Sequence, residues 1–135
     1  MFNWKKSAEA DLKDYMKQKK SIKNLTEQID VLNADIEKFK ESSDEKKKNK
    51  VCQSLVLREK LVKNLELTKK NINLIDKGLS DLDDEQRKVL YLFYISGGGF
   101  RRVMDEFHIE QASAYRRKDE ALRDFTIAMY GMVES

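Results

Sequence analysis

The stretch that decides the fold is FRRVMDEFHIEQASAYRRKDEALRDF, residues 100–125, which has the pattern of two short amphipathic helices around a tight turn. In the first helix, apolar residues recur at helical spacing and leave Arg101 and Arg102 outside. In the second, Ser113 and Arg116 share the side opposite the apolar positions. Such a pattern predicts a helix-turn-helix, whose second helix fits the major groove of DNA. The expected inward positions are Phe100, Val103, Met104, Phe107, Ala114, Ala121, Leu122 and Phe125.

The segment before this stretch is expected to form a supporting helix. Asp83 followed by Gln86 has the spacing of a capping box, which favours a helix start. The predicted helix, residues 84–95, is apolar nearly all round, so it must be buried on several sides. The glycines at 97–99 end this helix and let the chain turn. The last helix of the chain is expected to stop at Gly131.

The first half of the chain carries a coiled-coil pattern. From Ile22 onward, apolar residues alternate spacings of three and four, and no glycine or proline interrupts them. Segment 41–50 has no apolar residue, and the register does not survive beyond it. This break favours an antiparallel hairpin with its turn at about 42–50 over one continuous helix. The expected coiled-coil core consists of Ile22, Leu25, Ile29, Leu32, Ile36, Phe39, Leu57, Leu61, Leu65, Ile72, Ile75 and Leu79.

These patterns predict an all-α fold with two domains, a coiled-coil helical hairpin at 5–80 and a helix-turn-helix domain at 81–131. The composition agrees, since 38% of the residues are charged and proline is absent. Residues 1–82 carry 19 basic and 14 acidic groups, whereas residues 83–135 carry 8 and 10. The domain expected to read DNA is therefore the less basic one. This balance counts against tight nonspecific binding, which depends on neutralising phosphates.

One set of residues between Leu82 and Phe125 matches a known family in order and spacing: Leu82 to Leu90, Tyr94, Ile95, Gly97, Phe100, Val103, Met104, Phe107, Tyr115, Arg116, Ala121 and Leu122. On these residues the chain resembles the C-terminal, promoter-binding helix-turn-helix domain of bacterial sigma factors. It resembles more closely the sigma-like late-transcription regulators of phages, the ArpU/RinA type. The resemblance implies a phage-type, sequence-specific DNA-binding transcriptional regulator that acts with host RNA polymerase. Because the first 80 residues have the coiled-coil pattern, we expect no domain that melts promoter DNA, which excludes a full sigma factor.

Several positions depart from the family pattern. The family usually has Ala at the position of Met104 and a β-branched residue at that of Ala114, so large and small side chains are exchanged. The turn position that is usually glycine is His108, for which a left-handed backbone costs roughly 1–2 kcal/mol. The usual Ser or Thr cap of the second helix is Glu110, a poorer cap whose charge nevertheless suits a helix N-terminus.

The run of basic residues in the second helix has two interpretations. It could be a solvated face, as charged runs on helices commonly are. The helix-turn-helix context favours contact with DNA instead, because Arg can bond guanine bidentately and Gln can bond adenine. We expect base readout by Gln111, Ser113 and Arg116. Phosphate contacts are expected from Arg101, Arg102, Arg117 and Lys118.

The sequence offers no catalytic constellation. The glycine triplet lacks the spacing of a phosphate-binding loop and is a connector. His108 has no nucleophile beside it, and the lone Cys52 excludes an intramolecular disulfide. We therefore expect no enzyme, cofactor or metal. No signal peptide or membrane-spanning run is present, so a cytoplasmic location without a membrane partner is expected.

Two other functions remain open at this point. A DNA-packaging protein of the small-terminase type also joins a helix-turn-helix to an oligomerising coil. A protein-binding adaptor, with a helix-turn-helix that no longer contacts DNA, is favoured by the acidic balance of residues 83–135. The expected partners are double-stranded DNA and host RNA polymerase. The coiled coil favours a homodimer or higher oligomer, because a single small domain reads DNA weakly unless it is doubled.

Overall fold

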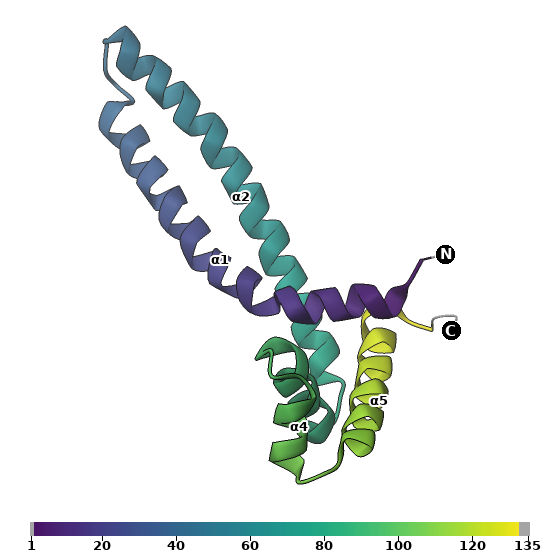
Figure 1. The fold of residues 1–135 in the computed structure, drawn as a ribbon. Helices are drawn as coiled ribbons and strands as arrows, with labels where there is room; N and C mark the ends of the chain where they lie inside the picture. Colours follow the sequence, from purple (N-terminus) through teal and green to yellow (C-terminus); the bar gives the residue numbers. More distant parts are fainter. Residues whose placement is uncertain (1, 133–135) are drawn as a thin grey trace. The chain divides into compact units, whose positions relative to one another are not determined.

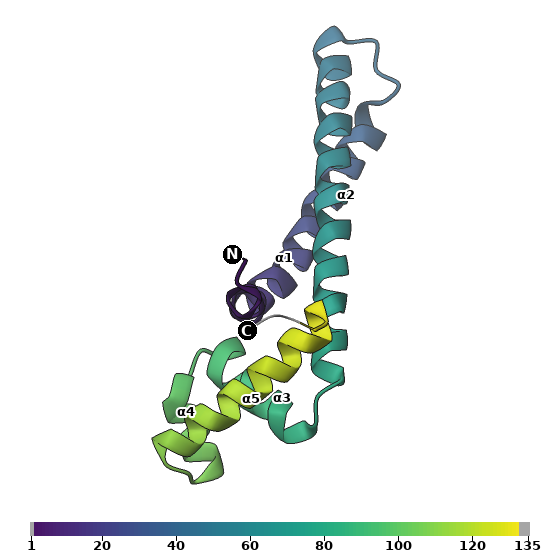
Figure 2. The same ribbon diagram turned by 90° about the vertical axis from the view of Figure 1, so that its right-hand side faces the viewer.

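The chain is all-α in a computed structural model that describes residues 2–132 (Figures 1 and 2). No strand occurs among these residues, and none of their helices is long and apolar enough to cross a membrane. The elements are α1 (Trp4–Phe39), α2 (Glu45–Ser80), α3 (Asp84–Leu90), the π-helical turn η1 (Tyr91–Ile95), α4 (Gly99–Phe107) and α5 (Gln111–Tyr130).

Two compact units make up the chain, and both include parts of the two long helices. The hairpin unit is residues 17–71, and the base unit is residues 1–16 together with residues 72–135. This division differs from the predicted domains at 5–80 and 81–131. The difference arises because the first turns of α1 and the last turns of α2 pack in the base unit, through contacts between residues far apart in sequence.

In the hairpin unit, α1 and α2 run side by side in opposite directions (Figures 1 and 2). Two side-chain hydrogen bonds define their register. The Arg58 guanidinium donates to Asn33 Oδ1 at 2.9 Å, and the Asn71 amide donates to Gln18 Oε1 at 2.6 Å. The predicted antiparallel hairpin is therefore confirmed, and the single continuous helix is excluded.

The seam between these helices departs from the prediction at one position. Leu57 is 48% exposed, whereas Ser54 is buried and Arg58 is half-buried. Counting back from Leu65 and Leu61 with alternating spacings of four and three leads to Arg58 and Ser54, not to Leu57. The expected core role of Leu57 is therefore wrong. The other expected core residues are half-buried or buried, but Ile72, Ile75 and Leu79 belong to the base unit and not to the hairpin unit. Those in the hairpin unit are Ile22, Leu25, Ile29, Leu32, Ile36, Phe39, Leu61 and Leu65.

The turn of the hairpin is shorter than the predicted 42–50. Helix α1 ends at Phe39 and α2 begins at Glu45. The Asp44 carboxylate accepts a hydrogen bond from the backbone N–H of Lys46 at 2.9 Å, which helps to start α2. The residues at 45–50 are Lys, Glu and Asn without an apolar side chain, and Lys and Glu are good helix formers. Lack of an apolar stripe therefore did not prevent this segment from being helical.

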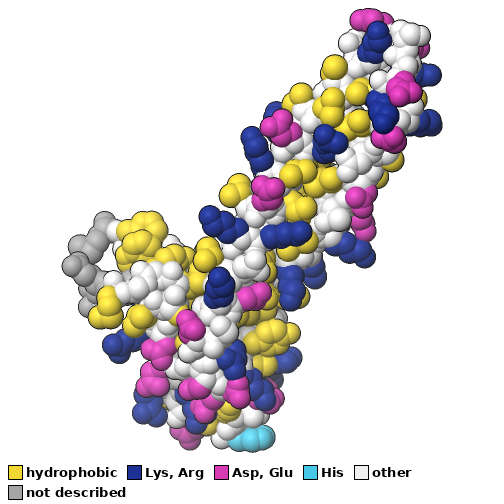
Figure 3. Space-filling model, turned by 180° about the vertical axis from the view of Figure 1, so that it is seen from behind, with side chains coloured by type: hydrophobic (Ala, Val, Ile, Leu, Met, Phe, Trp, Pro, Cys, Tyr) yellow, Lys and Arg dark blue, Asp and Glu magenta, His cyan; other side chains and the backbone are white. Residues whose placement is uncertain are grey.

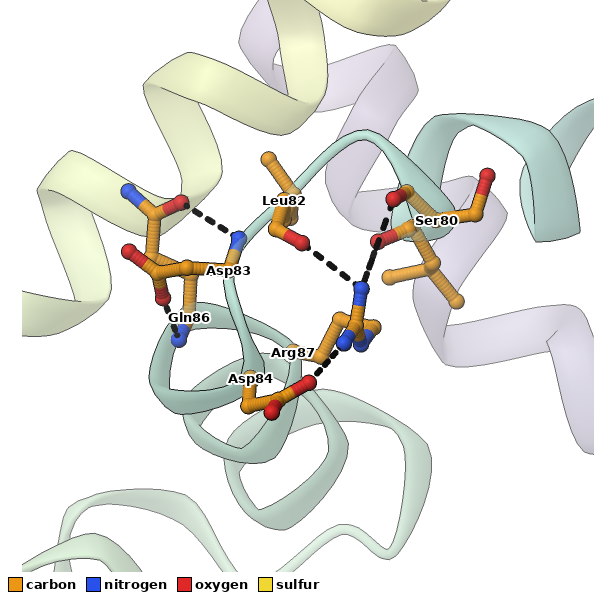
Figure 4. A network of polar contacts seen from close by, with 7 residues as sticks. Ser80, Leu82, Asp83, Asp84, Gln86 and Arg87 are labelled. Atoms are coloured by element: carbon orange, nitrogen blue, oxygen red, sulfur yellow. Dashed lines mark hydrogen bonds and ion pairs between the residues drawn. The ribbon is translucent and has the colours of Figure 1, made fainter.

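The link from α2 to α3 is stabilised by hydrogen bonds of Asp83, Gln86 and Arg87 (Figure 4). Asp83 Oδ1 accepts from the Gln86 backbone N–H at 2.7 Å, and Gln86 Oε1 accepts from the Asp83 backbone N–H at 3.4 Å. This reciprocal pair is the predicted capping box. The Arg87 guanidinium donates to the carbonyls of Leu82 at 2.6 Å and Ser80 at 3.4 Å, so it satisfies acceptors at the end of α2.

Helix α3 continues into the π-helical turn η1, and together they occupy the predicted range 84–95. The backbone N–H of Ser96 donates to the Tyr91 carbonyl at 2.8 Å, which is the wider i to i+5 spacing of a π-helix. Val89, Leu90, Leu92 and Tyr94 are buried. The expected burial on several sides is therefore confirmed for this helix.

Tyrosine–carboxylate hydrogen bonds tie the first turns of α1 to the rest of the base unit. Ala8 and Leu12 of this segment are fully buried. Burial raises the pKa of Tyr15, Tyr94 and Tyr130, and the hydrogen bond of each tyrosine to its carboxylate raises the pKa further. The pairs are Tyr15 with Asp76 (2.6 Å), Tyr94 with Glu9 (3.0 Å) and Tyr130 with Asp11.

Helix α5 passes close to α2 at Gly78. A Cβ atom at this position would lie 2.9 Å from Met129 Sδ and 3.1 Å from Cε1 of the buried Phe125 ring. The absence of a side chain at Gly78 thus allows the two helices to approach. Helix α5 itself ends at Gly131, as the sequence predicts.

Candidate nucleic-acid interface

The turn between α4 and α5 depends on a left-handed residue. His108 has φ 53° and ψ 49°, and its backbone N–H donates to the Met104 carbonyl. The N–H of Ile109 donates to the same carbonyl at 3.2 Å. His108 therefore takes the position and the conformation that a glycine commonly has after a helix. This local geometry leaves only three residues between the end of α4 and the start of α5.

Helix α5 starts without a side-chain cap. Glu110 is extended, with φ −80° and ψ 165°, and its side chain makes no capping hydrogen bond. Its carbonyl accepts from the Ala114 N–H at 3.0 Å, the first bond of the helix. The carboxylate can stabilise α5 only through its charge near the positive end of the helix dipole. Glu110 is thus the poorer cap that the sequence suggests.

The inner faces of α4 and α5 agree with the prediction. Val103 is fully buried, and Phe100, Met104 and Phe107 are half-buried. The inward residues of α5 are all buried, and they are Ala114, Ala121, Leu122 and Phe125. Because these residues hold α5 by one side, the opposite side of its first turns is the one that a ligand can reach.

The three residues expected to read bases all lie in the first two turns of α5, but only Ser113 and Arg116 share a side of the helix. Gln111 and Arg116 are exposed, and Ser113 is half-buried. The Arg116 guanidinium donates to Ser113 Oγ at 3.3 Å. The bond restrains the long arginine side chain and leaves its other N–H groups available to an acceptor.

Two of the expected phosphate contacts, Arg101 and Arg102, are exposed on α4. The stem of Arg102 lies against Gly98, where a Cβ atom would be only 1.9 Å from Arg102 Cγ. Lys88 and, more weakly, Arg102 lower the pKa of the Glu106 carboxyl. Glu106 therefore places a negative charge one helical turn after Arg102.

Arg117 is engaged within the protein. Its guanidinium forms an ion pair with Glu85 of α3 at 2.6 Å and lies 5.3 Å from the centroid of the Phe107 ring. The side chain is 38% exposed. A phosphate contact from Arg117 would compete with these interactions, so its geometry supports a structural role more directly than a binding role.

Lys118 is not on the exposed face, which corrects the prediction of a phosphate contact. Its side chain is only 11% exposed, and its ammonium forms an ion pair with Asp119 at 2.9 Å. The ammonium also lies among aromatic rings, with centroid distances of 4.7 Å to Tyr115, 5.4 Å to Phe93 and 5.8 Å to Phe100. The physical reason is helical spacing, because position 118 is four residues after Ala114 and shares its inner side.

Sequence reasoning did not include Tyr115 among the candidate contacts. This residue is 52% exposed beside Arg116, and its ring stacks on Phe100 with a centroid distance of 5.5 Å and an interplanar angle of 19°. The ammonium of Lys118 holds it as well. An exposed aromatic ring with a restrained orientation can contact a partner at a low entropic cost. Its position in the sequence, between the predicted readout residues Ser113 and Arg116, could have indicated that Tyr115 lies near the contact face.

The base unit as a whole is slightly acidic, with 12 basic and 15 acidic residues. Within residues 2–132, no cluster of three metal-ligating side chains is present. Comparisons of the chain with protein-family models, curated proteins and solved structures gave no match.

Proposed function

We propose that this chain is a sequence-specific DNA-binding regulator of transcription, of the sigma-like phage type, that reads a duplex through α5. One observation carries the proposal. Ser113 and Arg116 lie together on the accessible side of the first turns of α5, Gln111 is exposed at the first residue of the helix, and the side opposite Ser113 and Arg116 is buried. A helix supported in this way after a tight turn has the form of a recognition helix.

Gln111 and Arg116 are the readout residues of this proposal. Arg116 would donate two hydrogen bonds to guanine, and Gln111 would bond adenine. Ser113 positions Arg116 through the 3.3 Å hydrogen bond, which reduces the entropy lost on binding. Tyr115 adds a restrained aromatic contact next to them.

We propose fewer phosphate contacts than the sequence analysis predicts. Arg101 and Arg102 are exposed at α4 and are retained. Lys118 is left out because its ammonium is enclosed, and Arg117 is left out because it is paired with Glu85. The base unit then supplies few phosphate contacts, which agrees with a regulator that acts together with host RNA polymerase.

A second candidate function is a protein-binding adaptor with a helix-turn-helix that does not contact DNA. It is favoured by the acidic excess of the base unit and by the internal pairing of Arg117. In that case the accessible face of α5, including Tyr115, would contact a protein.

The test is selection of duplexes from a random pool by the full chain at 50 mM salt, followed by sequencing of what binds. The proposal expects an enriched motif that Arg116→Ala loses. Arg123→Ala is the matched control, since Arg123 is an exposed arginine of the same helix beyond the readout turns. A folded wild-type protein that retains no duplex, with or without added host polymerase, would favour the adaptor.

A further inference from the structure

The positive charge of this protein is concentrated on the hairpin unit. Residues 17–71 carry 15 basic and 9 acidic groups, against 12 and 15 in the base unit. Figure 3 shows Lys and Arg side chains spread along the hairpin. The hairpin tip, residues 38–50, carries six lysines and three acidic residues in thirteen positions.

Four of the six lysines of the hairpin tip lie where the dipole of α2 disfavours positive charge. Lys46, Lys47, Lys48 and Lys50 occupy the first turns of α2, close to the positive end of its dipole. Lys46 and Lys50 are four residues apart and Lys47 and Lys50 are three apart, so like charges are neighbours on one side of the helix. Local stability therefore does not explain this placement. Departures from local rules of this kind are expected where a surface has a function.

Ammonium groups from both helices converge on one ring at the hairpin tip. The Nζ atoms of Lys38, Lys47 and Lys50 lie 5.2, 5.5 and 5.4 Å from the centroid of the Phe39 ring. Among the six lysines of the tip, only Lys40 forms an ion pair with a carboxylate in the described chain, at 2.8 Å to Glu37. The tip thus presents several cations on a common aromatic support without neutralising partners.

The chemistry of the hairpin tip selects one class of partner. Insertion into a membrane surface needs exposed apolar side chains among the charges, whereas the one apolar residue of the tip, Phe39, is half-buried. The cores of protein interfaces are poor in lysine and rich in arginine and aromatic residues, whereas the hairpin unit has one arginine. Mobile ammonium groups act as point charges that suit phosphates without reading sequence.

We propose that the hairpin tip is a sequence-independent binding surface for the phosphate backbone of duplex DNA. This inference rests on the proposed function, because it adds to α5 the phosphate neutralisation that the acidic base unit lacks. Lys47, Lys50 and Lys38, whose ammonium groups lie over the Phe39 ring, are expected to contribute, together with the exposed Lys46 next to them. Base readout by α5 supplies specificity, and the tip supplies affinity that falls with salt.

The test measures binding of the full chain to fluorescent duplexes over a range of salt concentrations. The tip variant is Lys46→Gln/Lys47→Gln/Lys50→Gln. The matched control, Lys60→Gln/Lys69→Gln/Lys70→Gln, makes the same change in net charge at exposed positions of the same helix. Each phosphate contact contributes about 0.9 to the slope of log K against log salt, so the tip variant should lower the slope by about 2–3. It should weaken selected and random duplexes alike, and the control should change the slope by less than about 1.

Circular dichroism should show unchanged helix content in both variants, because the tip lysines are exposed. Equal losses in the tip variant and the control would overturn the proposal, since net charge alone would then explain them. An unchanged slope in the tip variant, together with loss of the selected motif in Arg116→Ala, would overturn the tip surface and leave the proposed function standing. Absence of any duplex binding by the wild-type chain would overturn both.

Discussion

The ammonium nitrogen of Lys118 lies 4.7 Å from the centroid of the Tyr115 ring, one helical turn earlier in α5. The lysine belongs to the buried side of the helix and the tyrosine to its accessible side. The pair therefore connects the packing of α5 against Phe93 and Phe100 with the face that we propose contacts DNA. It also separates two neighbouring basic residues, Lys118 and Arg116, into different roles.

Lys118→Ala is expected to destabilise the fold by about 1–3 kcal/mol. The substitution removes cation–π contacts and the packing of the aliphatic stem from a largely buried position. Urea unfolding followed by circular dichroism measures this loss. Arg116→Ala serves as the comparison, because an exposed substitution should change stability by less than about 0.5 kcal/mol. Equal effects of the two substitutions would contradict the enclosed position of Lys118.

Arg116→Ala is expected to weaken binding to the preferred duplex by about 1–3 kcal/mol and to relax the preference at one base pair. Arg102→Ala should instead weaken all duplexes alike and reduce the salt slope by about 1. Fluorescence anisotropy with selected and scrambled duplexes distinguishes these results. A uniform loss in Arg116→Ala would mean that this side chain holds a phosphate and does not read a base.

The seam of the hairpin predicts different costs for two leucines of α2. Leu57 is 48% exposed, so Leu57→Ala should cost less than about 1 kcal/mol. Leu65 is half-buried on the seam, and Leu65→Ala should cost about 2 kcal/mol. Urea unfolding of both variants provides the comparison. If Leu57→Ala lost more stability than Leu65→Ala, Leu57 would be a core residue, as the sequence analysis predicted.

Gly78→Val should destabilise the base unit, because its Cβ would lie 2.9 Å from Met129 Sδ and further atoms would extend toward α5. We expect a loss of about 1–3 kcal/mol, typical of overpacking. Shortening the side chain that is in the way, with Met129→Ala, should recover about 1 kcal/mol of that loss in the double variant. Strictly additive costs in a double-mutant cycle would mean that the two positions do not share space.

Stability is expected to fall as the pH rises from 10 to 12. Burial, with the hydrogen bonds to Asp76 and Asp11, raises the pKa of Tyr15 and Tyr130 from 10.0 to about 12. In this range the folded chain holds protons that the unfolded chain has lost, so the stabilisation present below pH 10 disappears toward pH 12. The stability advantage of the wild type over Tyr15→Phe/Tyr130→Phe should therefore shrink over this window. Denaturant unfolding measures both proteins between pH 9 and 12. A constant difference in their free energies of unfolding over this range would contradict the dependence of stability on the raised tyrosine pKa values.

Local and periodic features were predictable from the sequence because their causes lie within a few residues. The capping box of Asp83 and Gln86, the turn at His108 and the helix end at Gly131 all depend on nearby backbone groups. The alternation of three and four after Ile22 likewise predicted one half of the hairpin seam. The all-α architecture and the antiparallel hairpin follow from these signals.

Tertiary structure decided what depends on partners distant in the chain. The pairing of Arg117 with Glu85 and the enclosure of Lys118 removed two basic side chains from the predicted phosphate contacts. The tyrosine–carboxylate bonds, such as that of Tyr94 with Glu9, placed the start of α1 in the base unit. A helical pattern shows which residues share a side, but it does not show which charges and rings another helix brings against that side. The sequence alone therefore determined the helices and their caps, and packing between them determined which side chains remain available to a partner.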